Sequence, residues 1–295
     1  MPVKELWPSV APKGAGMEGS SVQSCHYVRC IAAVLSVAVA TLGDPGPSRA
    51  GLIGITLGSP GTTLYDISIA NGAPTNPRTV ASKINTIAVA PSGTIYAVSQ
   101  GFPSDVPPGG SLYTINPSTG VPTPVGVLNE FIVTEGDLAC DPTTGILYAV
   151  DGVGELFTIN TSTAACTVVG TVTVAFNEDL SAMAFDSAGT LYMVDSFGPS
   201  LVKVNKSTAA VIGSVTMNAD VNREIGGLAF DPMSGVAYYA AGTTSMLYTV
   251  NTTTGLATPV GPIAAPTGIS GLAFYDVGPT PTDRVGWGSI KGRYR

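Results

Sequence analysis

The sequence predicts an all-β fold made of repeated four-stranded units, and three observations lead to this prediction. A phrase that reads GGLAFDPMSGVAYYA at 226–240 recurs in related forms, and its alanines lie 51, 45, 45 and 44 residues apart. The copy at 179–215 reads as four short strands, expected at 182–185, 190–194, 201–205 and 211–215, separated by turn-forming Gly, Pro, Ser and Asp. Only 11% of the residues are charged, which suits a β-rich exported protein. A period near 45 with four strands per unit is typical of a β-propeller blade. The repeated alanines are Ala88, Ala139, Ala184, Ala229 and Ala273.

Residues 1–50 read as a disordered start followed by a secretory signal peptide. Arg29 precedes an apolar run at 31–40, and small residues follow it, with plausible cleavage after Ala40 or Ala50. The run is too short to span a bilayer comfortably, so we expect no membrane span. A buried helix is the alternative reading. The signal peptide predicts an exported protein that is secreted, periplasmic or held at the cell surface.

The propeller is expected at 51–276, with its ring closed by its two ends. Residues 51–80 supply strands two to four of a blade that lacks its first strand, and GLAFYD at 271–276 is a first strand with nothing after it. Pairing the two removes an open sheet edge. With the units that begin at 84, 135, 179 and 225, this gives a single domain of five blades. The tail at 277–295 is Pro-rich and basic, and reads equally as an anchoring tag or a solvated extension.

Charge and residue usage exclude several classes of function. Between 51 and 276 there are sixteen acidic and five basic residues, a net charge near −11 that opposes nucleic-acid binding. The one histidine, His26, lies in the leader, so the mature chain lacks a Ser-His-Asp triad or a His-ligated zinc site. Cys140 and Cys166 are expected on the first and fourth strands of one blade, ~14 Å apart, too far for a disulfide.

The recurring phrase GLAFDPxSGxLYxVD…LYTINxxTG resembles the NHL-type propeller repeat of exported bacterial proteins. The resemblance covers about 225 residues and implies the fold rather than one activity, because this architecture serves binding proteins, lyases and lactonases. In the related gluconolactonase branch, acidic and amide side chains at the channel mouth hold a divalent metal. No full motif of that branch is present, and its usual six blades are not found, so no enzyme assignment follows.

Two sets of side chains are candidates for function. The tyrosines Tyr96, Tyr148, Tyr192 and Tyr238 recur once per blade and are expected to pack between blades, with a ligand platform as the alternative. The loops before the first strand and after the second strand open onto one face, where carboxylates gather. Oxygen ligands of this kind suit a hard cation such as Ca²⁺. The alternative is that they are solvated or cap turns. These predicted metal ligands are Glu135, Asp137, Asp151, Asp179, Asp195 and Glu224.

Two functions fit these features. The favoured one is an exported, monomeric, non-catalytic propeller without a cofactor, acting as a binding scaffold for a protein, glycan or surface partner. It is favoured because a chain with few charges and no histidine after the leader offers little catalytic apparatus. The alternative is a calcium-dependent hydrolase or lyase of the gluconolactonase type, acting at the acidic mouth. Metal content after purification separates the two.

Overall fold

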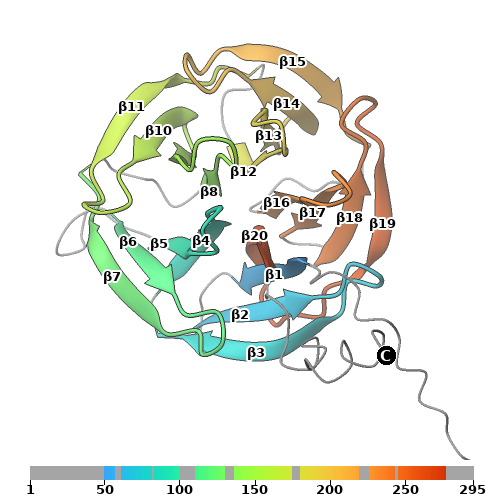
Figure 1. The fold of residues 1–295 in the computed structure, drawn as a ribbon. Coiled ribbons are helices and arrows are strands. Elements are labelled where there is room, and N and C mark those ends of the chain that lie inside the picture. The colour runs from blue at the N-terminus through green and yellow to red at the C-terminus, as the bar shows by residue number, and fades with distance from the viewer. Residues whose placement is uncertain are drawn as a thin grey trace, which may run out of the picture. The chain divides into compact units, whose positions relative to one another are not determined.

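The computed structural model describes residues 50–56, 61–81, 83–99, 110–129, 136–174, 180–218, 226–242 and 245–276. Over these residues the chain forms twenty strands, arranged as five antiparallel four-stranded blades in a ring, with the first strand of each blade innermost (Figure 1). The prediction of an all-β, five-bladed propeller is confirmed. The predicted tail and all of the predicted leader except Ala50 lie outside the described residues.

Each blade is named here by its number, and its strands are given from the channel outwards. Blade 1 contains β20 (Ile269–Asp276), β1 (Ala50–Thr56), β2 (Thr62–Ile67) and β3 (Pro74–Val80). Blade 2 contains β4 (Ile84–Val89), β5 (Ile95–Ser99), β6 (Ser111–Ile115) and β7 (Pro122–Val127). Blade 3 contains β8 (Gly136–Cys140), β9 (Leu147–Asp151), β10 (Glu155–Ile159) and β11 (Cys166–Thr171). Blade 4 contains β12 (Leu180–Phe185), β13 (Leu191–Asp195), β14 (Ser200–Val204) and β15 (Val211–Thr216). Blade 5 contains β16 (Gly226–Phe230), β17 (Ala237–Ala241), β18 (Met246–Val250) and β19 (Ala257–Pro262).

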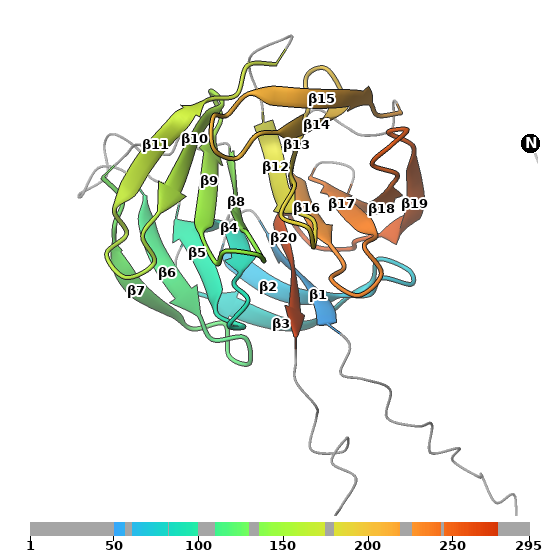
Figure 2. The same cartoon turned by 45° about the horizontal axis from the view of Figure 1, so that its top comes forward.

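The ring closes through the two ends of the repeat region, as the sequence predicts. β20 pairs antiparallel with β1, from Ala50 opposite Asp276 to Thr56 opposite Ile269, although the two strands stand at opposite ends of the chain. Figure 2 shows β20 and β1 side by side within blade 1. Because β20 completes a four-stranded sheet, no blade is left with three strands and an open inner edge.

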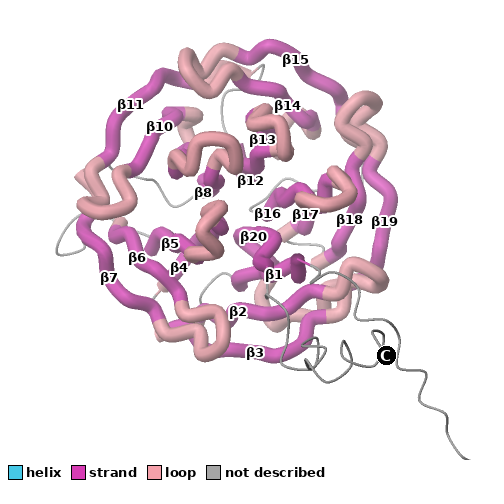
Figure 3. The backbone as a smooth tube through the Cα atoms, in the orientation of Figure 1, coloured by secondary structure: helices cyan, strands magenta, loops and turns pink. Residues whose placement is uncertain are grey.

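Burial falls from the channel to the outside of the ring. In β12, β9, β13 and β17 every residue is buried, whereas most of β15 is exposed. The inner two strands of each blade are covered on both faces by neighbouring blades. Their sequences are therefore apolar runs without the alternation expected of a sheet with one face in water. The outer strands carry the polar residues instead, and in Figure 3 they form the outer circle of the tube.

Tyrosines on the second strands hold neighbouring blades together. The ring centroid of Tyr148 in blade 3 lies 5.2 Å from that of Phe185 in blade 4, and Tyr192 and Phe230 lie 5.2 Å apart across the next interface. Tyr238 and Phe274 repeat the contact between blades 5 and 1 at 5.7 Å. Tilted pairs of this kind add to the apolar burial between the sheets. For these three tyrosines the prediction of packing between blades is confirmed.

The predicted strands of blade 4 differ from the observed ones by one or two residues. β12 begins at Leu180 rather than 182, because the strand continues through a bulge between Leu180 and Ala182. β13 and β14 each lie one residue away from their predicted starts or ends. The turn after β14 shows why strand three ends there: the Asn205 side-chain oxygen accepts the N–H of Ser207 at 2.9 Å.

Candidate functional site

At one register position of the five inner strands most residues are small, and there neighbouring inner strands approach one another closely. A Cβ added at Gly227 would lie 2.5 Å from the backbone nitrogen of Leu272 on the next inner strand, and one at Gly271 would lie 3.0 Å from that of Ile87. Neighbouring inner strands therefore approach too closely for large side chains. The five residues at this position are Thr86, Asp137, Ala182, Gly227 and Gly271.

Asp137 is the carboxyl group of this set, and it connects three blades. Its side chain is 2% exposed, and one oxygen accepts the Thr86 hydroxyl of blade 2 and the N–H of Leu138. The other oxygen accepts the N–H of Met183 in blade 4 at 2.7 Å. Burial raises the pKa of Asp137 to about 8, although the hydrogen bonds from Thr86, Met183 and Leu138 oppose the rise. Protein donors thus occupy both oxygens of this predicted metal ligand.

Asp151 and Asp195 end the second strands of blades 3 and 4 and cap the turns that follow. Asp151 accepts the N–H of Val153 at 3.1 Å and that of Glu155 at 2.7 Å, and burial raises its pKa. Asp195 accepts the N–H groups of Phe197 and Gly198, each at 3.1 Å. These contacts correspond to the turn-capping alternative that the sequence left open.

The other three predicted metal ligands, Glu135, Asp179 and Glu224, lie outside the described residues. Within the part of the chain that the structure describes, no three His, Cys, Asp or Glu side chains are grouped so that they could hold a metal ion. The calcium site stays a prediction. Cys140 and Cys166, at the end of β8 and the start of β11, are not joined in a disulfide.

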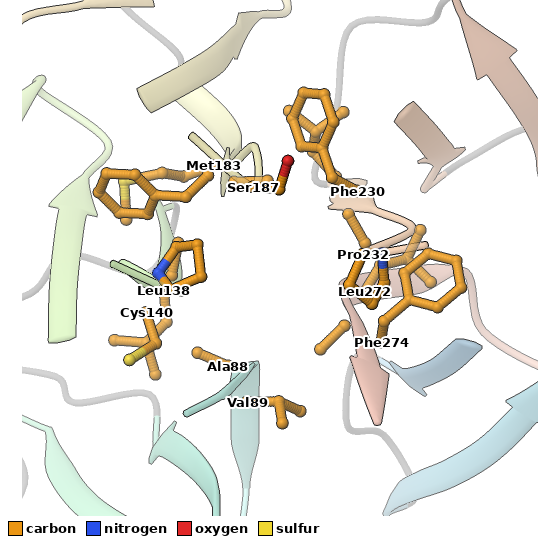
Figure 4. Close-up of a pocket in the computed structure, with 17 residues that line it drawn as sticks. Ala88, Val89, Leu138, Cys140, Met183, Ser187, Phe230, Pro232, Leu272 and Phe274 are labelled. Atoms are coloured by element: carbon orange, nitrogen blue, oxygen red, sulfur yellow. The ribbon is translucent and has the colours of Figure 1, made fainter. Parts of the chain in front are cut away.

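A cavity opens at the opposite end of the channel, where the first strands of blades 3, 4 and 5 turn into their second strands. Its volume is about 190 Å³. Figure 4 shows its wall, with Met183 and Cys140 on one side, Phe230 and Phe274 facing them, and Ser187 at the edge. We call this cavity the socket. Its lining from the inner strands is Ala88, Val89, Leu138, Ala139, Cys140, Met183, Ala184, Phe185, Leu228, Ala229, Phe230, Leu272, Ala273 and Phe274, and the turns add Pro142, Ser187 and Pro232.

The socket is asymmetric because one repeat position varies. That position holds valine in blade 2, cysteine in blade 3 and phenylalanine in blades 4, 5 and 1. Phe230 and Phe274 are half-buried, and each ring packs against a tyrosine of the preceding blade, so their orientation is fixed before any ligand arrives. Burial, with the nearby charge of Asp141, raises the pKa of the Cys140 thiol to about 11. The thiol stays protonated at neutral pH and acts as apolar wall rather than nucleophile.

Charged groups stand around the socket in the same turns. The buried carboxylate of Asp141 forms an ion pair with Lys206 at 2.6 Å, and the ammonium also donates to the carbonyl of Gly189 and lies over the ring of Phe185. Burial alone would raise the pKa of Asp141, yet Lys206 and hydrogen bonds from neighbouring threonines lower it to about 2. The equivalent turns carry Asp186 and Asp231. We call these turns the rim of the socket. With three carboxylates and one ammonium, the net charge of the rim is negative.

The site predicted from the sequence lies at the other end of the channel, and the socket was not predicted. The sequence does contain a signal. In three blades a phenylalanine follows the repeated alanine, whereas the residue two places before that alanine is alanine or glycine. Without the ring geometry, however, Phe230 and Phe274 read simply as strand core.

Comparisons with known proteins find one family model and several solved structures that are similar to this chain. Residues 137–277 match the model of a family described as a repeat of unknown function, DUF6923. No curated protein matches the chain. Among solved structures, a nidogen/laminin complex aligns with 11% identity and a TM-score of 0.49 over 77% of this chain and 98% of that one.

Two bacterial structures align as well. A structural genomics protein of unknown function from Bacteroides thetaiotaomicron aligns at 18% identity and a TM-score of 0.49, over 76% of this chain and 61% of that one. Glutaminyl cyclase from Myxococcus xanthus aligns at 16% and 0.42, over 64% of this chain and 69% of that one. The match at 137–277 covers blades 3 to 5 and the closing strand β20. The five four-stranded blades of the structure show that the chain is a β-propeller repeat protein.

Proposed function

We propose that this propeller is an exported, non-catalytic binding module that holds a polypeptide partner by inserting one large apolar side chain of that partner into the socket. The observation that carries the proposal is the socket itself, a preformed apolar cavity at the channel end with aromatic rings fixed by their neighbours. Binding hot spots commonly consist of an aromatic side chain in a well-packed, desolvated pocket.

The size of the socket favours a side chain over a free small molecule. Pockets for drug-sized ligands and cofactors commonly have volumes of roughly 300–1,000 Å³, whereas the socket has about 190 Å³. The turns beside it extend the apolar surface, since Ile146 is 42% exposed and Met233 59% exposed. A polypeptide that inserts one side chain could cover these residues as well, which a small ligand could not.

The test is selection of binding peptides from a displayed random library on the purified protein. Selected peptides should share an aromatic or large aliphatic residue, and should lose at least about tenfold in affinity, roughly 1.4 kcal/mol, towards a Ser187→Arg variant. Ser187 is exposed at the socket edge, so the arginine obstructs the opening without entering the core. Thr123→Arg, at an exposed site on the outer strand β7, is the matched control. Peptides that bind all three proteins equally would contradict the proposal.

Export rests on the leader and is part of the same proposal. Among the described residues there is no helix long and apolar enough to cross a membrane. Protein expressed with residues 1–50 and recovered after export should begin near Thr41 or Gly51, following the two cleavage sites in the sequence. N-terminal sequencing of the recovered protein checks this, and an intact Met1 would refute cleavage. The NHL-type relationship, a finer claim than the shared fold, stays a prediction.

A further inference from the structure

We propose that residues 277–295 of this chain themselves occupy the socket, with Trp287 inserted, so that the binding site carries its own competitor. The inference rests on the proposed function, because both use the socket. Its first support is the path of β20. Where the other inner strands turn back into their second strands, β20 runs past the socket residue Phe274 and ends two residues later at Asp276. The segment therefore starts at the opening of the socket.

The length of the segment is sufficient. Eleven residues lead from Asp276 to Trp287, among them two prolines and two glycines. Fully extended they would span at most ~36–40 Å, and as a flexible chain their root-mean-square reach is ~18 Å. Trp287 lies between Gly286 and Gly288, so no neighbouring side chain obstructs its entry into a narrow cavity.

The chemistry of the segment matches both features of the socket. Its indole is the large aromatic group that an apolar cavity of about 190 Å³ would take. The segment carries one acidic and four basic residues, so its net charge is opposite in sign to that of the rim, which holds Asp141, Asp186 and Asp231. The four basic residues are Arg284, Lys291, Arg293 and Arg295. Charge complementarity across such a contact speeds association and selects the partner.

Tethering makes even a weak contact effective. A segment joined by a short flexible linker is present at its site at an effective concentration in the millimolar range. Any external partner then competes with Trp287, and its apparent dissociation constant rises as the fraction of open socket falls. The apparent affinity for a partner would therefore depend on the free energy of displacing the segment as well as on the partner's contacts with the socket.

The experiment uses the full chain with Trp7→Phe, which leaves Trp287 as its sole tryptophan, since the sequence has two. The fluorescence of Trp287 should be blue-shifted and protected from acrylamide quenching. Both properties should be lost on adding Ser187→Arg and kept on adding Thr123→Arg. A solvent-exposed Trp287 in the Trp7→Phe protein overturns the inference. Protection that disappears on dilution also overturns it, because the segment would then occupy a second copy of the chain.

A second measurement separates this inference from the proposed function. Peptides selected for socket binding should bind the full chain with Trp287→Ser severalfold more tightly than the unaltered chain, and an equal affinity would contradict self-occupation. If Trp287 is exposed while selected peptides still depend on Ser187, the inference fails alone. If Trp287 is protected while no peptide depends on the socket, the proposed function fails alone.

Discussion

A chain that lacks Gly271–Asp276 is expected to aggregate, or to melt far below the intact protein. The deletion removes most of β20, including Leu272 and Ala273, which are 3% and 7% exposed, and the half-buried Phe274. Burial of a large apolar side chain contributes ~1.5–3 kcal/mol, while a whole domain is stable by only about 5–15 kcal/mol. The loss also uncovers an edge of β1 and the faces of β4 and β16 that lie against β20.

Thermal unfolding and size-exclusion chromatography measure this outcome. Deletion of Val277–Thr282, also six residues, keeps every residue of β20 and is the matched control, expected to melt close to the intact chain. If the Gly271–Asp276 deletion melts within a degree or two of the control and stays monodisperse, the closure through β20 and β1 does not hold the ring together.

The blades were predictable because their signals are local and repeated. In blades 3, 4 and 5 an aspartate, Asp141, Asp186 or Asp231, follows the first strand and accepts the N–H of the residue two places later, and the period counts the units. Ring closure followed from two incomplete units that complement each other, and β20 beside β1 confirms it. The strand ends were less accurate, since the bulge at Leu180 depends on pairing across the blade, which no single strand sequence reveals.

The candidate site was less predictable because its properties arise between blades. The repeats place the carboxylates of Asp137, Asp151 and Asp195 near one mouth, but a sequence does not show which of their oxygens already accept hydrogen bonds from the backbone. Asp137 reaches Met183 only because two inner strands lie close together. The socket likewise exists only once five strands stand in a ring, which turns the side chains of Phe230 and Phe274 from strand core into the wall of a cavity.

The free energy of unfolding is expected to fall as the pH rises from about 4 to about 8, chiefly through Asp137. Burial raises its pKa in the folded protein from 3.8 to about 8. In that interval the unfolded chain has released the proton while the folded chain keeps it, so the folded state binds more protons and loses stability with increasing pH. At 1.36 kcal/mol per pKa unit the full loss is on the order of 5 kcal/mol. Asp141, with its pKa lowered to about 2, acts with the opposite sign, and its stabilisation is lost only below about pH 4.

Denaturant unfolding at a series of pH values, with Asp137→Asn beside the unaltered protein, tests this expectation. The amide cannot ionise, so in the variant the free energy of unfolding should depend much less on pH. Asp151, whose pKa is also raised, would leave a smaller dependence. At pH 4–5 the variant should be less stable, because an amide cannot accept from Leu138 and Met183 on both of its atoms. Near pH 9 the variant should be the more stable of the two proteins, because the unaltered protein then buries the charged carboxylate of Asp137. Asp195→Asn, at a carboxylate that caps a turn within one blade, should retain the slope. A stability that stays flat between pH 4 and 8 in the unaltered protein would show that Asp137 is already ionised in the folded ring.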